Sequence, residues 1–435
     1  MVTSHGWLGA KRQKNAVTPP RSCQKANPSG AAPIGTRTPF ASIGTSIRRG
    51  SSDLHSAMSW QLGRAKSRKI NLRIREEMAN ATKNLHDLGQ SIWLDNITRR
   101  LLTSGTLRRY IAEYSVTGLT SNPTIFDHAI KNSGDYDKTI NQKFAEGKSG
   151  ERIFFDLALE DLVQAADLFR EIHDRTNGVD GWVSLEVSPE LAHDTANTVA
   201  AAKELHARAD RPNLFIKIPG TAEGLPAIEE AIFAGVHVNV TLLFSCEQYL
   251  AAAEAYMRGT ERRIAAGLRP DVASVASIFI SRWDVALYGK TPDLRNRLGI
   301  AIAKRTFCAY RSLLDSPRMQ RMLNAGARPQ RLLWASTGTK DPAASDLVYV
   351  KALAAPFTVN TMPEDTLNAL ADHGIFDGTL SPDGGDCEYM LAEFGLAGID
   401  IDALGAQLQE EGAASFVKSW RELMSCIESK TKALV

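Results

Sequence analysis

The sequence of 435 residues has no long apolar run, and none approaches the roughly 18 residues that a membrane-spanning helix needs. Its first residues place His5, Lys11 and Arg12 around a short patch of Trp7 and Leu8, which lacks the apolar region of a secretory signal. We therefore expect a soluble protein without a membrane partner. With 43% hydrophobic and 23% charged residues, the composition excludes a fibrous or wholly disordered protein.

Cysteine is also scarce, and the few cysteines show no paired or metal-like spacing. This excludes a disulfide framework and a cysteine-based zinc site, and the histidines form no recognisable ligand cluster. We expect reduced thiols in a reducing, cytoplasmic compartment and no metal. The five cysteines are Cys23, Cys246, Cys308, Cys387 and Cys426.

Acidic residues are nearly missing from the first 75 residues, which hold 14 Lys and Arg and the single acid Asp53. The remaining residues hold 37 Lys and Arg against 48 Asp and Glu, so the two parts carry net charges of +13 and −11. An acidic body argues against nucleic acid as a partner.

Residues 1–77 are rich in Ser, Arg, Lys, Gly and Pro and show no sustained helical or strand period. They predict a disordered basic extension ahead of a folded domain over residues 78–435. Three interpretations of the extension stay open: an organelle transit peptide, which would change the compartment, an arm that binds an anionic surface, or upstream sequence that is not normally translated. Met78, immediately before the first patterned segment, suggests the third.

From residue 91 onward, short strand-like runs alternate with longer stretches of helical period, which is typical of repeated βα units and a parallel sheet. Side chains alternate within a run: in VHVNVTLLF, Val238, Val240 and Leu242 are expected on one side, with Asn239 and Thr241 on the other. Eight strands are predicted, over residues 91–97, 115–120, 181–188, 214–219, 236–244, 272–280, 331–336 and 357–361.

The stretch between the third and fourth runs illustrates the predicted helices. Leu191, Thr195 and Val199 fall on one helical face. Ser188 is placed to cap this helix and Pro189 suits its first position, so the helix is expected to begin at residue 189.

The polar face of the strands decides between two α/β folds. An open parallel sheet is covered on both faces and is usually apolar on both, whereas a closed barrel turns one face of each strand inward. The doubly wound alternative is weakened because no G-x-G-x-x-G follows the first strand. We therefore predict a single (β/α)8 TIM barrel with extra C-terminal helices and functional groups at the carboxyl ends of its strands.

Lys217 is the charged residue within an apolar run from Phe215 to Pro219, where it is expected inside the barrel. It can pair with a carboxylate, or its stem can be buried while its head reaches water. Alternatively, desolvation favours the neutral amine, which attacks a carbonyl and forms a Schiff base. The other inward polar groups favour the last explanation, because carboxylates transfer protons and amides and hydroxyls hold a polyhydroxylated chain.

Six segments, SIWLDNI, VTGLTSNPTIF, WVSLEVSP, LFIKIPGT, VHVNVTLLFS and TVNTMP, occur in this order. Over residues 84–430 the sequence resembles the transaldolases, class I aldolase-type barrels of the pentose phosphate pathway, in their longer bacterial and plant-type branch. The resemblance implies Schiff-base transfer of a dihydroxyacetone unit from sedoheptulose 7-phosphate to glyceraldehyde 3-phosphate, giving erythrose 4-phosphate and fructose 6-phosphate. It implies sugar-phosphate substrates and no cofactor, and it is compatible with a homodimer.

The resemblance also implies catalytic roles for four residues on the strands. Lys217 forms the Schiff base with the ketose donor, and Asp95 is the general acid/base of carbon–carbon cleavage. Glu186 and Thr241 position a water for the proton transfers of carbinolamine formation and breakdown.

Substrate contacts are implied for a second set of residues. Asn122 and Asn239 bind the dihydroxyacetone hydroxyls, and Thr120 lines the same mouth. Ser277 and Arg282 match a serine and a phosphate-binding arginine of the sixth strand. Taken singly, each Asn has a simpler explanation as a turn cap, and each carboxylate as an ion-pair partner.

The sequence departs from the family pattern in WASTGTK, after the seventh strand. The shorter branch of the family has an arginine where this chain has Gly338. We therefore assign the second phosphate contact to Ser336 and Lys340, since barrels often bind phosphate on the loops after strands seven and eight.

Two other functions stay open. A simple aldolase uses the same enamine but protonates it, and it releases free dihydroxyacetone without an acceptor. A regulatory protein with a basic extension and an inactive barrel would use Lys217 only as an ion-pair residue.

Overall fold

The computed structural model describes residues 81–376 and 378–432, so the predicted extension over residues 1–77 lies outside the described residues and the domain boundary at residue 78 stays a prediction. Eight parallel strands pair in sequence order and close into a barrel, which confirms the (β/α)8 TIM barrel. The strands are β1 (Ser91–Asp95), β2 (Val116–Thr120), β3 (Trp182–Glu186), β4 (Leu214–Pro219), β5 (Val238–Leu243), β6 (Ser274–Phe279), β7 (Arg331–Ala335) and β8 (Val359–Met362).

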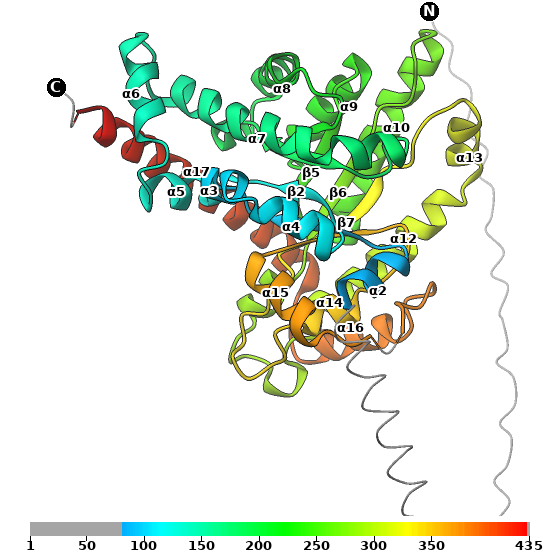
Figure 1. The fold of residues 1–435 in the computed structure, drawn as a ribbon. Helices are drawn as coiled ribbons and strands as arrows, with labels where there is room; N and C mark the ends of the chain where they lie inside the picture. The colour runs from blue at the N-terminus through cyan, green and yellow to red at the C-terminus, as the bar shows by residue number, and fades with distance from the viewer. Residues whose placement is uncertain (1–80, 377, 433–435) are drawn as a thin grey trace, which may run out of the picture. The chain divides into compact units, whose positions relative to one another are not determined.

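Helices surround the strands, with α7 to α10 on one side of the barrel and α14 to α16 on the other in Figure 1. The expected extra C-terminal helices are α16 and α17. The helices are α2 (Ala81–Asp87), α3 (Arg99–Thr103), α4 (Thr106–Glu113), α5 (Pro123–Lys131), α6 (Asp137–Ala145), α7 (Gly150–Arg175), α8 (Thr195–Ala209), α9 (Gly224–Ala234), α10 (Cys246–Ala265), α11 (Ser281–Ala286), α12 (Leu298–Leu314), α13 (Pro317–Asn324), α14 (Val348–Ala352), α15 (Glu364–His373), α16 (Cys387–Leu396) and α17 (Ile401–Lys432).

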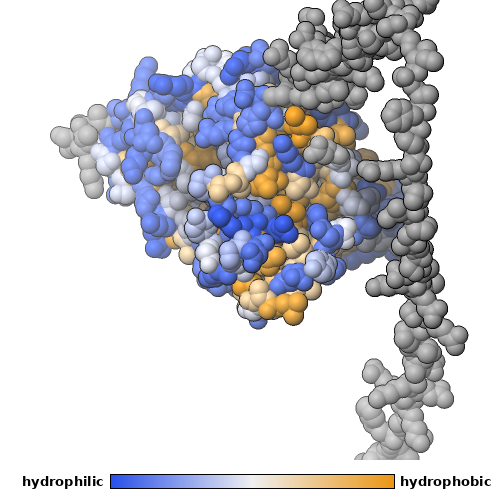
Figure 2. Space-filling view, turned by 90° about the horizontal axis from the view of Figure 1, so that it is seen from below, coloured by the Kyte–Doolittle hydropathy of each residue, from blue (hydrophilic) through white to orange (hydrophobic). Residues whose placement is uncertain are grey.

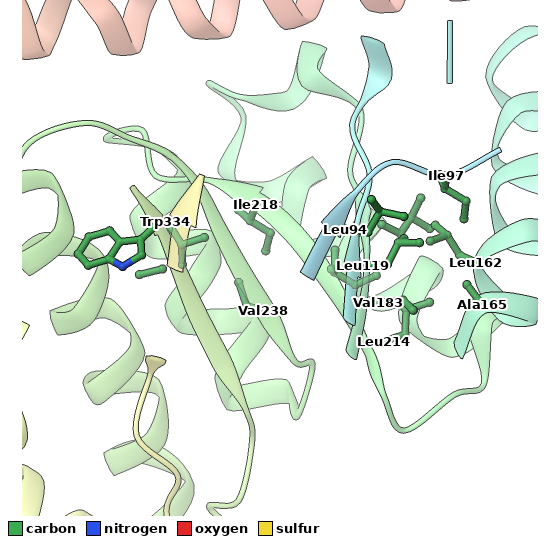
Figure 3. Close-up of a cluster of buried hydrophobic side chains, with 14 of the residues drawn as sticks. Leu94, Ile97, Leu119, Leu162, Ala165, Val183, Leu214, Ile218, Val238 and Trp334 are labelled. Atoms are coloured by element: carbon green, nitrogen blue, oxygen red, sulfur yellow. The ribbon is translucent and has the colours of Figure 1, made fainter. Parts of the chain in front are cut away.

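The outward side chains of the strands form the layer between barrel and helices. Leu94, Leu119 and Val183 come from three successive strands and lie beside Leu162 and Ala165 of α7, as Figure 3 shows. All five are buried. This burial of apolar surface is the main force that holds the helices on the barrel.

The inward side chains form a second cluster, which includes Trp93, Trp182 and Phe215. The rings of Trp182 and Phe215 are stacked, with their centroids 4.1 Å apart. The ring centroids of Trp93 and Phe215 are 6.1 Å apart. Gly118 makes room for this layer, because a β-carbon at that position would lie 2.6 Å from the indole Nε1 of Trp93. The barrel interior is therefore a packed core rather than a channel.

The helix after β3 does not begin at residue 189, so its predicted start was wrong. Pro189–Leu191 form only a short 3-10 helix, and the Ser188 side chain makes no capping bond. Helix α8 begins at Thr195, where Asp194 Oδ1 accepts a hydrogen bond from the Asn197 amide at 3.0 Å. Asp194 therefore caps α8 by accepting a hydrogen bond from a free amide in its first turn. Ser188 lies too far upstream to reach that amide.

The alternation predicted for the fifth strand fails at Leu242. Val238 and Val240 join the outer apolar cluster as expected, but Leu242 joins the inner one. Leu242 has a φ of 58°, and the pairing of β5 with β6 changes register between Val240 and Leu243. A bulge of this kind adds a residue to one strand and so reverses the faces that follow it.

Large apolar side chains also reach the surface, among them Phe357 and Leu396. Figure 2 shows hydrophobic residues gathered on the face seen from below, among hydrophilic ones. Such patches are common sites of contact between proteins. No helix within residues 81–376 and 378–432 is long and apolar enough to cross a membrane.

Candidate active site

The carboxyl ends of the first four strands bring the main polar side chains together. Asp95, Thr120 and Glu186 are the last residues of β1, β2 and β3, and Lys217 lies near the end of β4. Asp95 is in register with Thr120, and Lys217 is in register with both Glu186 and Asn239. Residues in register on adjacent parallel strands lie side by side.

A cavity of about 230 Å³ opens at these strand ends. Two of the predicted site residues, Glu186 and Asn239, do not line it. Nine of them line it: Asp95, Thr120, Asn122, Lys217, Thr241, Ser277, Arg282, Ser336 and Lys340.

Lys217 has both an acidic partner and an open cavity beside it. Its Nζ lies 3.0 Å from Glu186 Oε2 and donates a hydrogen bond of 3.0 Å to the Ser121 carbonyl oxygen. Only 6% of the side chain is exposed, which excludes a head group that reaches bulk water. The carboxylate partner considered from the sequence is therefore present, and the amine still faces a space that a ligand can enter.

Glu186 and Thr241 present unused hydrogen-bonding atoms. Oε1 of Glu186 and Oγ1 of Thr241 are buried without a hydrogen-bond partner among the described residues, whereas Oε2 of Glu186 is paired with Lys217 Nζ. Burial raises the pKa of Glu186, and the charge of Lys217 opposes that rise. Leaving a buried polar group without a partner costs about 1–3 kcal/mol, so these atoms are suited to hold a small polar molecule such as water.

Asp95 receives a hydrogen bond of 2.7 Å from Thr120 Oγ1, and that hydroxyl also lies 2.6 Å from Thr361 Oγ1. Burial raises the pKa of Asp95, against the lowering effects of Lys217 and of the Thr120 hydrogen bond. A carboxyl group whose pKa is shifted toward neutrality is suited to move protons at physiological pH.

Asn122 combines the structural and the functional explanation of its side chain. Its Oδ1 accepts a hydrogen bond of 3.0 Å from the Ile125 amide and caps α5, whose first residue is Pro123. The same side chain lines the cavity, so its amide group remains available to a substrate oxygen.

Asn239 is more fully engaged by the protein. Its Nδ2 donates to Ser184 Oγ at 3.1 Å, and its Oδ1 accepts from Ser277 Oγ at 2.7 Å. Since Ser277 lines the cavity and Asn239 does not, Asn239 orients the Ser277 hydroxyl in this structure.

Arg282 places a positive charge at the cavity without a carboxylate partner. Its guanidinium makes no ion pair with any described residue and lies 5.3 and 5.8 Å from the ring centroids of Phe279 and Phe416. Burial lowers the pKa of Arg282. Ser336 and the exposed Lys340 line the same cavity, so this side of the mouth is suited to bind an anion.

Helix α17 closes part of the mouth. Gln409 Nε2 donates to the carbonyl oxygens of Leu242 and Gly220 at 2.9 and 3.1 Å, which fixes the helix across the ends of β4 and β5. Phe416 then lines the cavity, with its ring centroid 6.0 Å from Lys217 Nζ. The sequence did not identify Phe416, because an apolar residue in a C-terminal amphipathic helix is indistinguishable from an ordinary core residue.

Thr361 and Phe279 are two further cavity residues that the sequence did not identify. Thr361 lies in the TVNTMP segment, which is one of the six segments that resemble the family. The resemblance indicated a site there but did not indicate which side chain of the segment contributes to it. Among the described residues, no group of three or more His, Cys, Asp and Glu side chains is arranged to hold a metal ion.

Comparison with known proteins gives a consistent result. The sequence profile described as "Transaldolase/Fructose-6-phosphate aldolase" matches residues 92–427. A protein named transaldolase from Saccharopolyspora erythraea is 45% identical over 354 residues, which is 80% of this chain and 96% of that protein. Proteins of the same name from Parafrankia sp. and Thiobacillus denitrificans are each 43% identical, over 81% and 80% of this chain and 98% and 99% of their own lengths.

Proposed function

The chain belongs to the transaldolase/fructose-6-phosphate aldolase family, and we propose that Lys217 carries the dihydroxyacetone unit as a Schiff base during its transaldolase reaction. The donor is sedoheptulose 7-phosphate and the acceptor is glyceraldehyde 3-phosphate. The observation that carries the proposal is an enclosed amine, paired with one carboxylate, that faces a cavity with an unpaired arginine.

The first half of the reaction forms the covalent intermediate. The donor phosphate binds Arg282, with Ser336 and Lys340 beside it, which holds the ketose carbonyl near Lys217 and makes the attack effectively intramolecular. The neutral amine attacks the carbonyl carbon, and one proton of the attacking nitrogen passes to the carbonyl oxygen to give the carbinolamine. A second proton, from the Glu186 carboxyl group, lets that oxygen leave as water, and the protonated imine remains on Lys217. Glu186 and Thr241 hold the water that relays these protons.

Cleavage and transfer then use Asp95. Its carboxylate removes the proton from the donor hydroxyl, the adjacent carbon–carbon bond breaks toward the positively charged imine, and erythrose 4-phosphate leaves. A three-carbon enamine remains on Lys217, with its hydroxyls near Asn122 and Ser277. The enamine carbon attacks the aldehyde of glyceraldehyde 3-phosphate, Asp95 returns the proton, and hydrolysis of the imine releases fructose 6-phosphate.

Borohydride reduction with fructose 6-phosphate tests the proposal directly. We expect the intact mass to increase by one reduced dihydroxyacetone unit and peptide mapping to place it on Lys217. The Lys217→Met variant, which keeps the length of the side chain, is expected to stay folded and to gain no mass. Label on another lysine, or turnover by Lys217→Met, would refute the assignment.

We further propose that the protein acts in the cytoplasm as a homodimer. The scattered cysteines, which show no paired spacing, support a reducing compartment. Sedimentation equilibrium tests the dimer, and a monomer at micromolar concentration would contradict it.

A further inference from the structure

A second cavity, of about 500 Å³, opens at the opposite end of the barrel and is larger than the one at the catalytic mouth. It is lined by the first residues of several strands: Ser91 of β1, Trp182 of β3, Ser274 of β6 and Arg331 of β7. The inner aromatic layer separates it from the strand ends that carry Lys217. The transaldolase reaction uses none of its side chains.

The floor of this cavity is apolar. Trp182 and Phe215 both line it, and their rings are stacked with centroids 4.1 Å apart and planes inclined by 25°. Val275 and Leu314 add aliphatic walls. The outer face and the edges of such a stacked pair favour a planar apolar ligand, since aromatic groups prefer offset stacking or edge contacts.

Arg328 gives the cavity an unpaired positive charge. The side chain is half-buried and lines the cavity, and its guanidinium makes no hydrogen bond or ion pair with any described residue. A partly desolvated cation is stabilised by a nearby anion, so this group is available to a negatively charged ligand.

Arg331 adds a second cation that is held only by uncharged oxygens. It donates to the Val179 carbonyl at 2.9 Å, to Ser91 Oγ at 2.7 Å and to the Thr358 carbonyl at 3.0 Å. Asp180, the carboxylate among the lining residues, is 5% exposed and accepts from Ser91 Oγ and from Trp93 Nε1. The lining therefore has an excess of positive charge.

We propose that this cavity binds a small planar anion, an aromatic carboxylate or a ligand of the same chemistry, with its ring packed against the stacked pair of Trp182 and Phe215 and its anionic group on Arg328. The volume is in the range of about 300–1,000 Å³ that is usual for small-molecule sites. The basic segment at the start of the chain is a poor occupant, because its 14 Lys and Arg against one acid are repelled by the same arginines.

The test is calorimetric titration of the full chain with 2-naphthoate, and with 2-naphthamide as a neutral ligand of the same shape. We expect one site per chain for 2-naphthoate and weaker binding of the amide. Arg328→Gln should weaken 2-naphthoate binding by about tenfold, as loss of a charge-assisted hydrogen bond does. The exposed Arg152 lines neither this cavity nor the cavity at the catalytic mouth. Arg152→Gln therefore serves as the matched control and should bind 2-naphthoate as tightly as the parent protein does.

Absence of binding, equal affinity of Arg328→Gln and the parent, or equal affinity of the amide and the carboxylate would each overturn the proposal. Displacement of 2-naphthoate by fructose 6-phosphate would also overturn it, because the ligand would then occupy the catalytic cavity. None of these readouts depends on turnover, so the result is independent of the role given to Lys217.

Discussion

Lys217 Nζ and Glu186 Oε2 lie 3.0 Å apart on the neighbouring strands β4 and β3, where the two residues are in register. Their side chains are only 6% and 3% exposed. The resting ion pair and the reactive neutral amine therefore differ by one proton that moves over a single short contact. Because the cavity adjoins Lys217, we propose that the same pair serves both folding and chemistry.

Glu186→Gln should damage stability and catalysis through this pair. It leaves a buried ammonium without its carboxylate, so we expect the free energy of unfolding to fall by about 3 kcal/mol. Loss of the proton acceptor should lower kcat by about 100-fold or more. Denaturant unfolding and steady-state kinetics measure the two effects.

The double variant Lys217→Met with Glu186→Gln is the control for stability. Neither member of the ion pair is charged in it, so the Glu186→Gln change should cost little stability in the Lys217→Met background. An equal loss of stability in both backgrounds would show that the ion pair does not contribute.

Asp95→Asn should separate imine formation from bond cleavage. Borohydride trapping on Lys217 should persist, while single-turnover release of erythrose 4-phosphate should slow by about 100-fold or more, since a general base is lost. A variant that cleaves at the parent rate would remove Asp95 from the proton-transfer step.

The pH dependence of stability gives an independent check on Asp95. Burial raises the pKa of Asp95, so the folded state binds a proton that the unfolded state releases. The parent protein should lose stability as the pH rises through the interval between the ordinary and the raised pKa. Asp95→Asn should lack this loss and be more stable than the parent at pH 7, as thermal unfolding at a series of pH values can show.

Arg282→Met should weaken the binding of phosphorylated substrates. The loss of a charge-assisted contact predicts a rise in KM of about tenfold or more with a smaller change in kcat. Because burial lowers the pKa of Arg282, the variant should be at least as stable as the parent. Lys340→Met, at an exposed position on the same cavity, should raise KM less, and an unchanged KM in Arg282→Met would exclude Arg282 from phosphate binding.

Phe416→Ala should let water reach the enamine. The ring lines the cavity 6.0 Å from Lys217 Nζ, so its removal opens the space around the intermediate. We expect a several-fold increase in free dihydroxyacetone released from fructose 6-phosphate when no acceptor is present. Phe144→Ala, on the surface of α6, is the control, and equal release by both variants would contradict this role.

His237→Gln should reduce the acid sensitivity of the fold. Burial lowers the pKa of His237 to about 3, so between that value and the ordinary pKa the unfolded state binds the extra proton. The parent should therefore lose about 2 kcal/mol through this residue as the pH falls from about 6.5 to 5. The exposed His128→Gln is the control, and identical pH profiles for both variants would contradict the prediction.

The alternation of side chains along the strands was sufficient to predict the closed barrel and the inward face of most site residues. Alternate residues of a strand share one face, so Phe215 and Lys217 lie on the same face of β4. This alternation depends only on the local geometry of the strand, which is why the sequence predicts it. It failed at Leu242 because a bulge depends on how two strands pair, and neither strand encodes that alone. The roles of the site residues came from the resemblance of six segments rather than from the period.

Only the tertiary structure decided which groups meet. Lys217 pairs with Glu186 because barrel closure sets the register of β3 and β4, and Phe416 reaches the cavity because α17 is anchored across the mouth by Gln409. The unpaired Arg328 beside the Trp182 and Phe215 rings likewise depends on segments distant in sequence. The sequence determines the face that each side chain takes, whereas contacts between distant segments depend on the closure and packing of the whole barrel.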